Sequence, residues 1–414
     1  MLQQLAKHID EQFSFLKEKK LLIAISGGVD SVVLAHLLHQ LHFNISLAHC
    51  NFLLRGKESD LDELFVKELG KSLNIQTFTT RFNTNEYATK NKLSTQLAAR
   101  ELRYSWFDTL SQENNFDYIL TAHHADDNLE TFLINLSRGT GLEGLTGIPP
   151  INKNIIRPLL IFSREEIVTF AQNNNIEWRE DKSNAETKYL RNKIRHQITP
   201  TLKELNPNLL NNFNKTIDHL KESQQIVNDK IEEITNEIVS KEGDLLKISI
   251  EKLLKLSNPK AYLYQLLKPY KFTEWNDVYN LIYTQSGKQI LTKNYTLLKD
   301  RDFLLLLRTS EKSSIEKEVY TIREENKEIT APIKLLLKRV QEKTDTDQKS
   351  IYVDNELLSY PLKLRRWNSG DFFYPTGMLG KKKISKYFKD EKISIINKNK
   401  IWILCSSKMR LFGL

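Results

Sequence analysis

The chain reads Leu21-Leu-Ile-Ala-Ile-Ser-Gly-Gly-Val-Asp-Ser31 near its start. An apolar run, two glycines and the start of a helical pattern follow one another without a gap. Backbone N–H groups at a helix start bind phosphate, and glycines let the phosphate approach closely. The pattern is neither a Walker A loop nor Gly-x-Gly-x-x-Gly, and an ordinary turn capped by Asp30-Ser31 is the alternative. The predicted phosphate-binding residues are Ser26, Gly27, Gly28, Val29, Asp30 and Ser31.

Strand-like and helix-like patterns alternate on both sides of this stretch. Helices are expected at 31–42, 59–73, 93–113 and 126–137, and strands at 21–26, 45–49, 76–82 and 118–121. This alternation predicts an α/β fold with a parallel sheet covered on both faces. Functional loops then lie at the carboxyl ends of the strands.

Composition narrows the classes of protein that are possible. The chain has 414 residues, with 61 Lys and Arg against 52 Asp and Glu, so its net charge is +9. That excess permits a polyanionic partner without requiring one. Two cysteines, Cys50 and Cys405, cannot build a disulfide framework. No stretch approaches the roughly 20 apolar residues that span a bilayer, and no signal peptide is evident, so we expect a cytoplasmic protein with no membrane partner.

The chain divides into four predicted segments. Residues 1–207 form the α/β domain, 208–310 a mostly helical middle domain, 311–329 a charged linker, and 330–414 a small α+β terminal domain. The middle domain begins with one long helix over 209–243 and ends in a hairpin of 292–299 with 303–308. Whether two copies pair as a homodimer is left open.

A second informative string, Thr121-Ala-His-His-Ala-Asp-Asp-Asn-Leu-Glu-Thr131, also follows a strand and opens a helix. Asp127 and Glu130 are three residues apart, so they share a helix face and could address one cation or one ammonium group. His123 could donate to a phosphate oxygen, whereas Asp126 could simply cap the helix. A carboxylate at Asp30 beside a phosphate requires a cation, which indicates Mg²⁺.

The first string resembles the PP-loop of the N-type ATP pyrophosphatases, which cleave ATP between the α- and β-phosphates. With the second string, the chain resembles the tRNA(Ile)-lysidine synthetase family. Further segments agree in order with that family's pattern, namely 49–59, 99–104, 157–160, 181–184, 191–195, 370–377 and 380–384.

The resemblance implies a reaction with ATP, Mg²⁺, free L-lysine and an isoleucine tRNA that has a CAU anticodon. AMP is transferred to the C2 oxygen of the wobble cytidine with release of pyrophosphate. The ε-amine of lysine then attacks C2 and AMP departs, giving lysidine. Most of this catalysis is positioning and charge stabilisation around a flipped-out base.

The resemblance also suggests roles for individual residues. Asp30 and Asp127 are candidates for Mg²⁺ and for the proton of the amine, and Glu130 with Asp127 for the lysine ammonium. The candidates that neutralise the α-phosphate or contact tRNA are Arg100, Arg103 and Arg195. For Arg100 and Arg103, a solvated helix surface is as good an interpretation.

Positive charge concentrates near the C-terminus. Residues 361–400 contain 11 Lys or Arg against three acidic residues, interleaved with aromatic side chains. Clustered cations favour RNA binding, although the aromatics could also fill a small core. The predicted tRNA contacts are Arg191, Arg195, Arg365, Arg366, Lys381, Lys382 and Lys383. The final residues 406–414 depart from the family's usual ending.

Two rival functions stay open at this stage. A tRNA thiolase shares similar strings but needs paired cysteines, which this chain lacks. A non-catalytic tRNA-binding scaffold would have no need of intact nucleotide loops.

Overall fold

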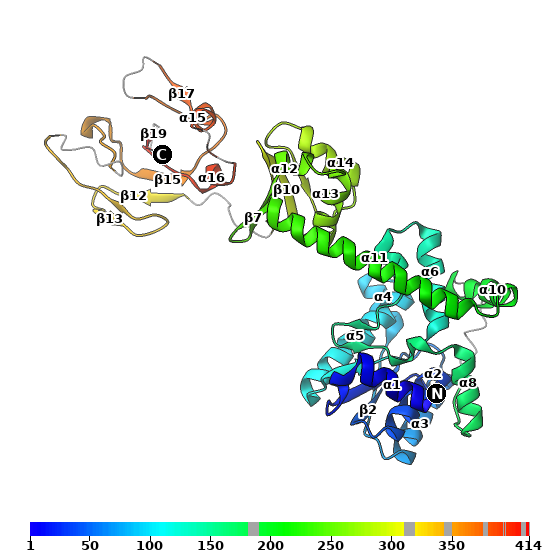
Figure 1. The fold of residues 1–414 in the computed structure, drawn as a ribbon. Helices are drawn as coiled ribbons and strands as arrows, with labels where there is room; N and C mark the ends of the chain where they lie inside the picture. Colours follow the sequence, from blue (N-terminus) through cyan, green and yellow to red (C-terminus); the bar gives the residue numbers. More distant parts are fainter. Residues whose placement is uncertain are drawn as a thin grey trace. The chain divides into compact units, whose positions relative to one another are not determined.

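The computed structural model describes residues 1–180, 190–309, 319–342, 350–375, 380–391, 393, 395–406 and 411–413 (Figure 1). The chain forms two compact units, Met1–Val227 and Asn228–Leu414. Residues 181–184 and 376–377, which carry part of the family resemblance, lie outside the described residues. So do residue 310, residues 311–318 of the predicted linker, and residues 407–410 and 414 of the atypical ending.

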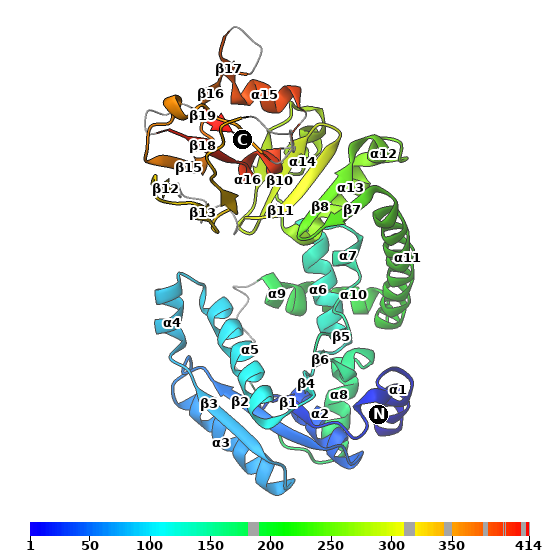
Figure 2. The same cartoon turned by 90° about the vertical axis from the view of Figure 1, so that its left-hand side faces the viewer.

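The first unit contains a six-stranded sheet in the order β3-β2-β1-β4-β6-β5, and Figure 2 shows β3, β2, β1 and β4 following one another across it. Every pairing is parallel except that of β5 with β6 at one edge. The predicted parallel sheet is therefore confirmed. Its strands are β1 (Leu21–Ala24), β2 (Ile45–Asn51), β3 (Thr77–Arg81), β4 (Tyr118–Leu120), β5 (Ile151–Asn152) and β6 (Ile155–Ile156).

Helices connect these strands, and the four predicted ones lie within two residues of their expected bounds. They are α2 (Val29–Gln40), α3 (Lys57–Ser72), α5 (Thr95–Asn114) and α6 (Ala125–Arg138). The remaining helices of the unit are α1 (Leu2–Gln12), α4 (Thr84–Asn91), α7 (Leu142–Leu145), α8 (Arg164–Asn173), α9 (Leu190–Lys193), α10 (Thr199–Leu205) and the start of α11 (Leu209–Ile238).

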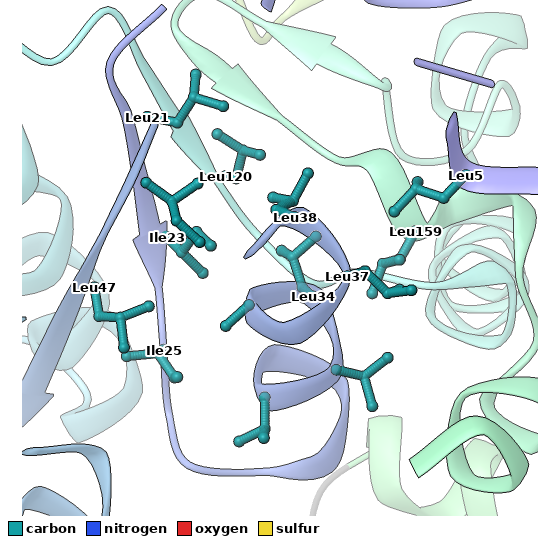
Figure 3. Packing of buried hydrophobic residues seen from close by; sticks show 14 of the residues in the cluster. Leu5, Leu21, Ile23, Ile25, Leu34, Leu37, Leu38, Leu47, Leu120 and Leu159 are labelled. Atoms are coloured by element: carbon teal, nitrogen blue, oxygen red, sulfur yellow. The ribbon is translucent and has the colours of Figure 1, made fainter. Parts of the chain in front are cut away.

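Alternate residues of β1 enter two different cores, as expected for a strand covered on both faces. Leu21 and Ile23 belong to the core that contains α2, and Leu22 to the core with Phe107 of α5. Figure 3 shows Leu37 on the side of α2 nearest Leu5 and Leu159. Strand β1 is thus packed on both faces, by the core with α2 and by the core with α5, and this packing fixes the position at which the following loop begins.

The middle segment contains the predicted hairpin, β10 (Tyr295–Asp300) with β11 (Phe303–Arg308). It also contains strands that the sequence analysis did not identify, because the predicted helix 209–243 ends at Ile238 and a turn at Gly243 starts a new hairpin. The five-stranded antiparallel sheet has the order β7-β8-β11-β10-β9. The further elements are β7 (Val239–Glu242), β8 (Leu245–Ser249), β9 (Gln289–Leu291), α12 (Ile250–Leu254), α13 (Pro259–Leu267) and α14 (Trp275–Asn280).

The terminal segment is α+β, as predicted, around a four-stranded sheet in the order β12-β15-β18-β19. Strand β12 (Tyr320–Ile322) lies inside the predicted linker and pairs with β15 (Leu362–Arg366), so this part of the linker belongs to the sheet. The other elements are β13 (Glu328–Ile329), β14 (Leu335–Leu336), β16 (Phe372–Phe373), β17 (Lys382–Lys383), α15 (Ile384–Asp390), α16 (Ile395–Lys400), β18 (Trp402–Cys405) and β19 (Leu411–Gly413).

Among the described residues, no helix combines the length and the apolar character needed to cross a bilayer.

The clamping of β1 and α2 gives a stability prediction. Leu37 is fully buried, so Leu37→Ala should lower the free energy of unfolding of the first unit by about 2–5 kcal/mol through lost burial and a residual cavity. Urea denaturation followed by circular dichroism measures the change. The control is Leu64→Ala on α3, where the side chain is 52% exposed and the expected change is within about 0.5 kcal/mol. Equal effects of the two variants would contradict this packing.

Candidate functional site

The phosphate-loop candidate joins the end of β1 to the start of α2. Gly27 has φ +92, a conformation that favours glycine, and Gly28 is the N-cap of α2 without a side-chain hydrogen bond to the helix. The first N–H groups of a helix have no partner within it. The loop therefore presents backbone donors at the positive end of the helix dipole, as predicted for an anion site.

The two loop hydroxyls brace this turn. Ser31 Oγ donates to Gly28 O at 3.0 Å and accepts from Ser26 N at 3.2 Å. The two hydroxyl oxygens are also 3.2 Å apart. Ser26 and Ser31 were expected to add donors for phosphate; in this structure they hold the loop in shape.

The second loop follows β4, which pairs directly with β1, so both loops lie at one edge of the sheet. His124 caps α6: its Nδ1 accepts from Asp127 N at 3.4 Å, and Asp127 Oδ2 accepts from His124 N at 3.2 Å. His124 Nε2 is 3.8 Å from Asp30 Oδ1. The two strings that the sequence analysis singled out thus meet through His124 and Asp30.

Among the acidic residues that the structure describes at this edge, Asp30 alone has a buried oxygen without a hydrogen-bond partner. Its Oδ1 is shielded from solvent and has no hydrogen-bond partner among the described residues. Burial raises the pKa of Asp30, and the electrostatic effects of His124, Arg164 and Arg195 only partly offset this rise. An ionised carboxylate held in this way is suited to a cation or a proton.

The donor set around Asp30 fits Mg²⁺ in one specific manner. Within the described part of the chain, no group of three His, Cys, Asp or Glu side chains could hold a metal ion. Mg²⁺ is commonly bound by one or two carboxylates together with phosphate oxygens and water. Asp30 could therefore hold Mg²⁺ only jointly with a nucleotide.

A compact ionic cluster joins the buried carboxylates of the first turns of α6 to two arginines. Arg195 donates through Nε to Glu130 at 2.6 Å and through a terminal nitrogen to Asp127 at 2.8 Å. Arg191 makes the corresponding bonds at 2.8 Å and 3.0 Å. Glu130 is only 1% exposed. The predicted lysine ligands are therefore paired with two of the predicted tRNA contacts.

Electrostatics differ between the two aspartates of the site. Burial would raise the pKa of Asp127, but His124, Arg191, His123 and Arg195 outweigh it and lower the pKa below the ordinary value. Asp127 also uses its oxygens for the helix cap and both arginines. It is consequently a poorer ligand for a metal ion than Asp30.

His123 is uncharged at neutral pH. Burial lowers the pKa of His123 to about 4, against the attraction of Asp127. Its Nδ1 lies 2.9 Å from Thr121 Oγ1. A neutral imidazole in this position can donate a hydrogen bond to an oxygen without adding charge.

Asp126 is a structural residue. It accepts from Arg164 N at 2.8 Å and forms an ion pair with Lys203, and these bonds join α8 and α10 to the start of α6. The sequence predicts Asp126 as a candidate helix cap, a role that His124 has instead. Lys203 and Arg164 belong to no recognisable motif, so the sequence alone does not indicate them as partners of Asp126.

Arg100 and Arg103 are exposed on α5. Their guanidinium carbons lie 5.0 Å and 5.2 Å from the ring centres of Tyr104 and Phe52. Neither is in an ion pair with any residue that the structure describes. Their positive charge is therefore available to an anionic ligand.

The predicted tRNA contacts of the terminal segment are of two kinds, those engaged within the fold and those exposed to solvent. Arg365 is buried and donates to both carboxylate oxygens of Asp371 at 2.8 Å, and the Arg366 guanidinium lies 3.9 Å from the Trp402 ring centre. These two are engaged within the fold. Lys381 and Lys383 are exposed, whereas Lys382 pairs with Asp390 at 2.8 Å.

Both cysteines are unsuited to thiolate chemistry. Burial raises the pKa of the Cys50 thiol to about 12, although Arg103 opposes this, and burial also raises the pKa of Cys405. They lie in different units, in β2 and β18. A paired-cysteine mechanism of sulfur transfer has no basis among these residues.

The chain is similar to known proteins over most of its length. A family model described as a PP-loop domain matches residues 1–202, and one described as a TilS substrate binding domain matches residues 241–309. The tRNA(Ile)-lysidine synthase of Bacteroides thetaiotaomicron is 39% identical over 97% of this chain and 92% of its own length. The enzymes of the same name from Parabacteroides distasonis and Clostridium perfringens are 36% and 31% identical, over 98% and 96% of this chain and 93% and 83% of their own lengths.

The contrasting aspartates give a prediction for the ligand-free protein. A carboxyl whose folded pKa is raised stabilises the fold fully only below its unfolded pKa, and this contribution is lost as the pH rises through the folded pKa. Asp30→Asn removes the buried charge, so at pH 7 the urea concentration at the unfolding midpoint should stay equal to that of the wild type or rise.

Asp126 provides the matched control. Burial would raise its pKa, but the bonds from Arg164 and Lys203 lower it, so its ionised form stabilises the fold at any pH above its unfolded pKa. Asp126→Asn should lower the midpoint in the same urea titration. Destabilisation of both variants would show that Asp30 is a structural ion.

Proposed function

This chain belongs to the tRNA(Ile)-lysidine synthase family, and from that premise we propose how its residues divide the work of ATP-dependent lysidine formation on tRNA-Ile. One observation carries the assignment of the site. The uncapped N-terminus of α2 lies beside a buried carboxylate oxygen of Asp30 that has no partner among the described residues.

The triphosphate of ATP binds the N–H groups of Gly27, Val29 and Asp30. The supporting evidence is the positive φ of Gly27, the glycine N-cap and the bracing of the loop by its two serines. His123 donates to a phosphate oxygen as a neutral imidazole. This arrangement delivers the α-phosphate to the edge of the sheet, where the base must arrive.

Asp30 would hold Mg²⁺ jointly with the bound nucleotide. When bound there, the ion would neutralise charge on the triphosphate and orient pyrophosphate as a leaving group. Asp127, the other predicted ligand, is committed to Arg191 and Arg195, so its contribution is secondary.

Free lysine binds at the ionic cluster of α6. The cluster has two carboxylates and two guanidinium groups, a balanced set that complements an amino-acid zwitterion. An ammonium group of lysine replaces a guanidinium at Glu130 and Asp127, and Arg195 then receives the lysine carboxylate. Arg191 is the more exposed arginine, 42% against 21%, and stays the candidate for an RNA phosphate.

The chemical steps follow from this placement. The C2 oxygen of cytidine attacks the α-phosphate and pyrophosphate leaves; Arg100 and Arg103 supply positive charge there without an ion pair to break among the described residues. The lysine amine then attacks C2, loses a proton, and AMP leaves. After pyrophosphate has departed, the raised pKa of Asp30 makes it a stronger base for that proton than Asp127.

Two segments contact the tRNA. Residues 241–309 match a domain described as substrate-binding, and Lys381 and Lys383 present exposed charge in the terminal segment. We place the reaction in the cytoplasm, where ATP, lysine and tRNA occur together.

The decisive experiment is mass analysis of the wobble nucleoside. The full chain is incubated with ATP, Mg²⁺, labelled lysine and an unmodified tRNA-Ile transcript, and we expect lysidine with one pyrophosphate released per tRNA. Asp30→Asn should reduce the rate at least about 100-fold while tRNA affinity is retained.

Three results would contradict this proposal. Sulfur in the nucleoside would indicate a thiolase. Absence of tRNA-dependent pyrophosphate release would indicate a scaffold. Near-normal turnover of Asp30→Asn would remove Asp30 from the site.

The terminal lysines give a separate prediction about RNA affinity. Replacing Lys381 and Lys383 with Ala should weaken tRNA binding. The negative slope of log K against log salt should become shallower by up to about 2, one per lost phosphate contact. The control replaces Lys7 and Lys17, which are exposed in the first unit and paired with Glu11 and Asp10. A slope that changes equally in both variants would reflect net charge alone.

A further inference from the structure

The peptide unit between Gly27 and Gly28 is held from outside the phosphate loop. Gly27 O accepts a hydrogen bond from the backbone N–H of Arg179 at 2.9 Å. In a planar trans peptide, the carbonyl and the following N–H point in opposite directions. The bond from Arg179 therefore fixes the direction of the Gly28 N–H as well.

This peptide unit needs holding because glycines flank it on both sides. Glycine occupies positive and negative φ with similar ease, so the unit can rotate at little local cost. A rotated unit would turn the Gly27 carbonyl oxygen toward the anion site, where it repels phosphate. Within the loop, the hydrogen bond that holds this peptide unit is long, because Gly28 N donates to Ser26 Oγ at 3.3 Å.

The side chain of Arg179 is anchored on α3. It forms ion pairs with Asp62 and, at 2.9 Å, with Glu58, and Arg55 binds the same Asp62 at 2.7 Å. Asp62 is buried, so solvent weakens its ion pair with Arg179 less than it weakens the exposed pair with Glu58.

Helix α3 also supports the loop directly. A Cβ at Gly27 would lie 3.6 Å from Phe65 and 3.8 Å from Val66. The helix therefore packs against Gly27 on one side and anchors the arginine that binds its carbonyl.

We propose that Arg179 is a positioning residue for ATP: its ion pairs with Asp62 and Glu58 fix its own backbone, which holds the Gly27–Gly28 peptide in the orientation that accepts a triphosphate. This inference rests on the proposed function of the loop. Arg179 acts through Gly27 and touches no substrate.

The test measures equilibrium binding of labelled ATP with Mg²⁺ to the full chain, without tRNA or lysine. If Arg179→Ala leaves only a tenth of the molecules in the competent orientation, the apparent Kd for ATP rises about tenfold. The KM values for lysine and tRNA should not change. Arg179→Lys, which keeps the positive charge, should recover part of the lost ATP affinity. If the alanine variant does not fold, the Kd of Arg179→Lys, expected between that of the wild type and a value about tenfold higher, serves as the test.

Arg81 offers a matched control. It also binds two carboxylates of α3, Glu63 at 2.8 Å and Asp60 at 3.1 Å, but the structure records no bond from it to Gly27. Arg81→Ala should leave ATP binding unchanged. A double-mutant cycle should show coupling between Arg179→Ala and Asp62→Asn, and additivity between Arg81→Ala and Asp62→Asn.

The outcomes separate this inference from the proposed function. The positioning role is supported if the wild type binds ATP, Arg179→Ala weakens that binding and Arg81→Ala leaves it unchanged. Equal ATP affinity of Arg179→Ala and the wild type overturns it, as does an equal loss in Arg81→Ala. Failure of the wild type itself to bind ATP would instead overturn the assignment of the loop.

Discussion

Parallel pairing of β1 with β4 is the constraint on which the rest of the site depends. Because parallel neighbours end at the same edge, the loops after residues 24 and 120 meet although almost a hundred residues separate them. Apolar layers on both faces of β1 make this pairing insensitive to the polar residues that follow it. Chemistry can therefore be concentrated in two short loops on a stable frame.

The site holds its charges in two ways. Asp127 and Glu130 are fully compensated by arginines, whereas Asp30 keeps an oxygen without a partner among the described residues. Ion pairs hold their charged groups in a defined geometry, whereas the Asp30 oxygen keeps a hydrogen-bonding capacity that no described residue uses. The same edge thus contains a cluster of paired charges and a carboxylate oxygen without a partner among the described residues.

The sequence was informative where structure is local. Strand-ending glycines, the Asp127–Glu130 spacing and the alternation of elements predicted the sheet, the helices and the meeting of the two loops. It was uninformative where partners are distant: the bonds of Arg179 to Asp62, Lys203 to Asp126 and Arg191 to Glu130 span 61 to 117 residues. Composition likewise could not separate the buried Arg365 from the exposed Lys381, because both belong to one basic run.

Burial of His123 has a consequence for acid stress. An imidazole with a pKa of about 4 stays predominantly neutral when the surrounding pH drifts between 8 and 5. The charge on this ring is then nearly constant over that interval. Acidification that protonates ordinary surface histidines therefore leaves the charge at this point of the sheet edge almost unchanged.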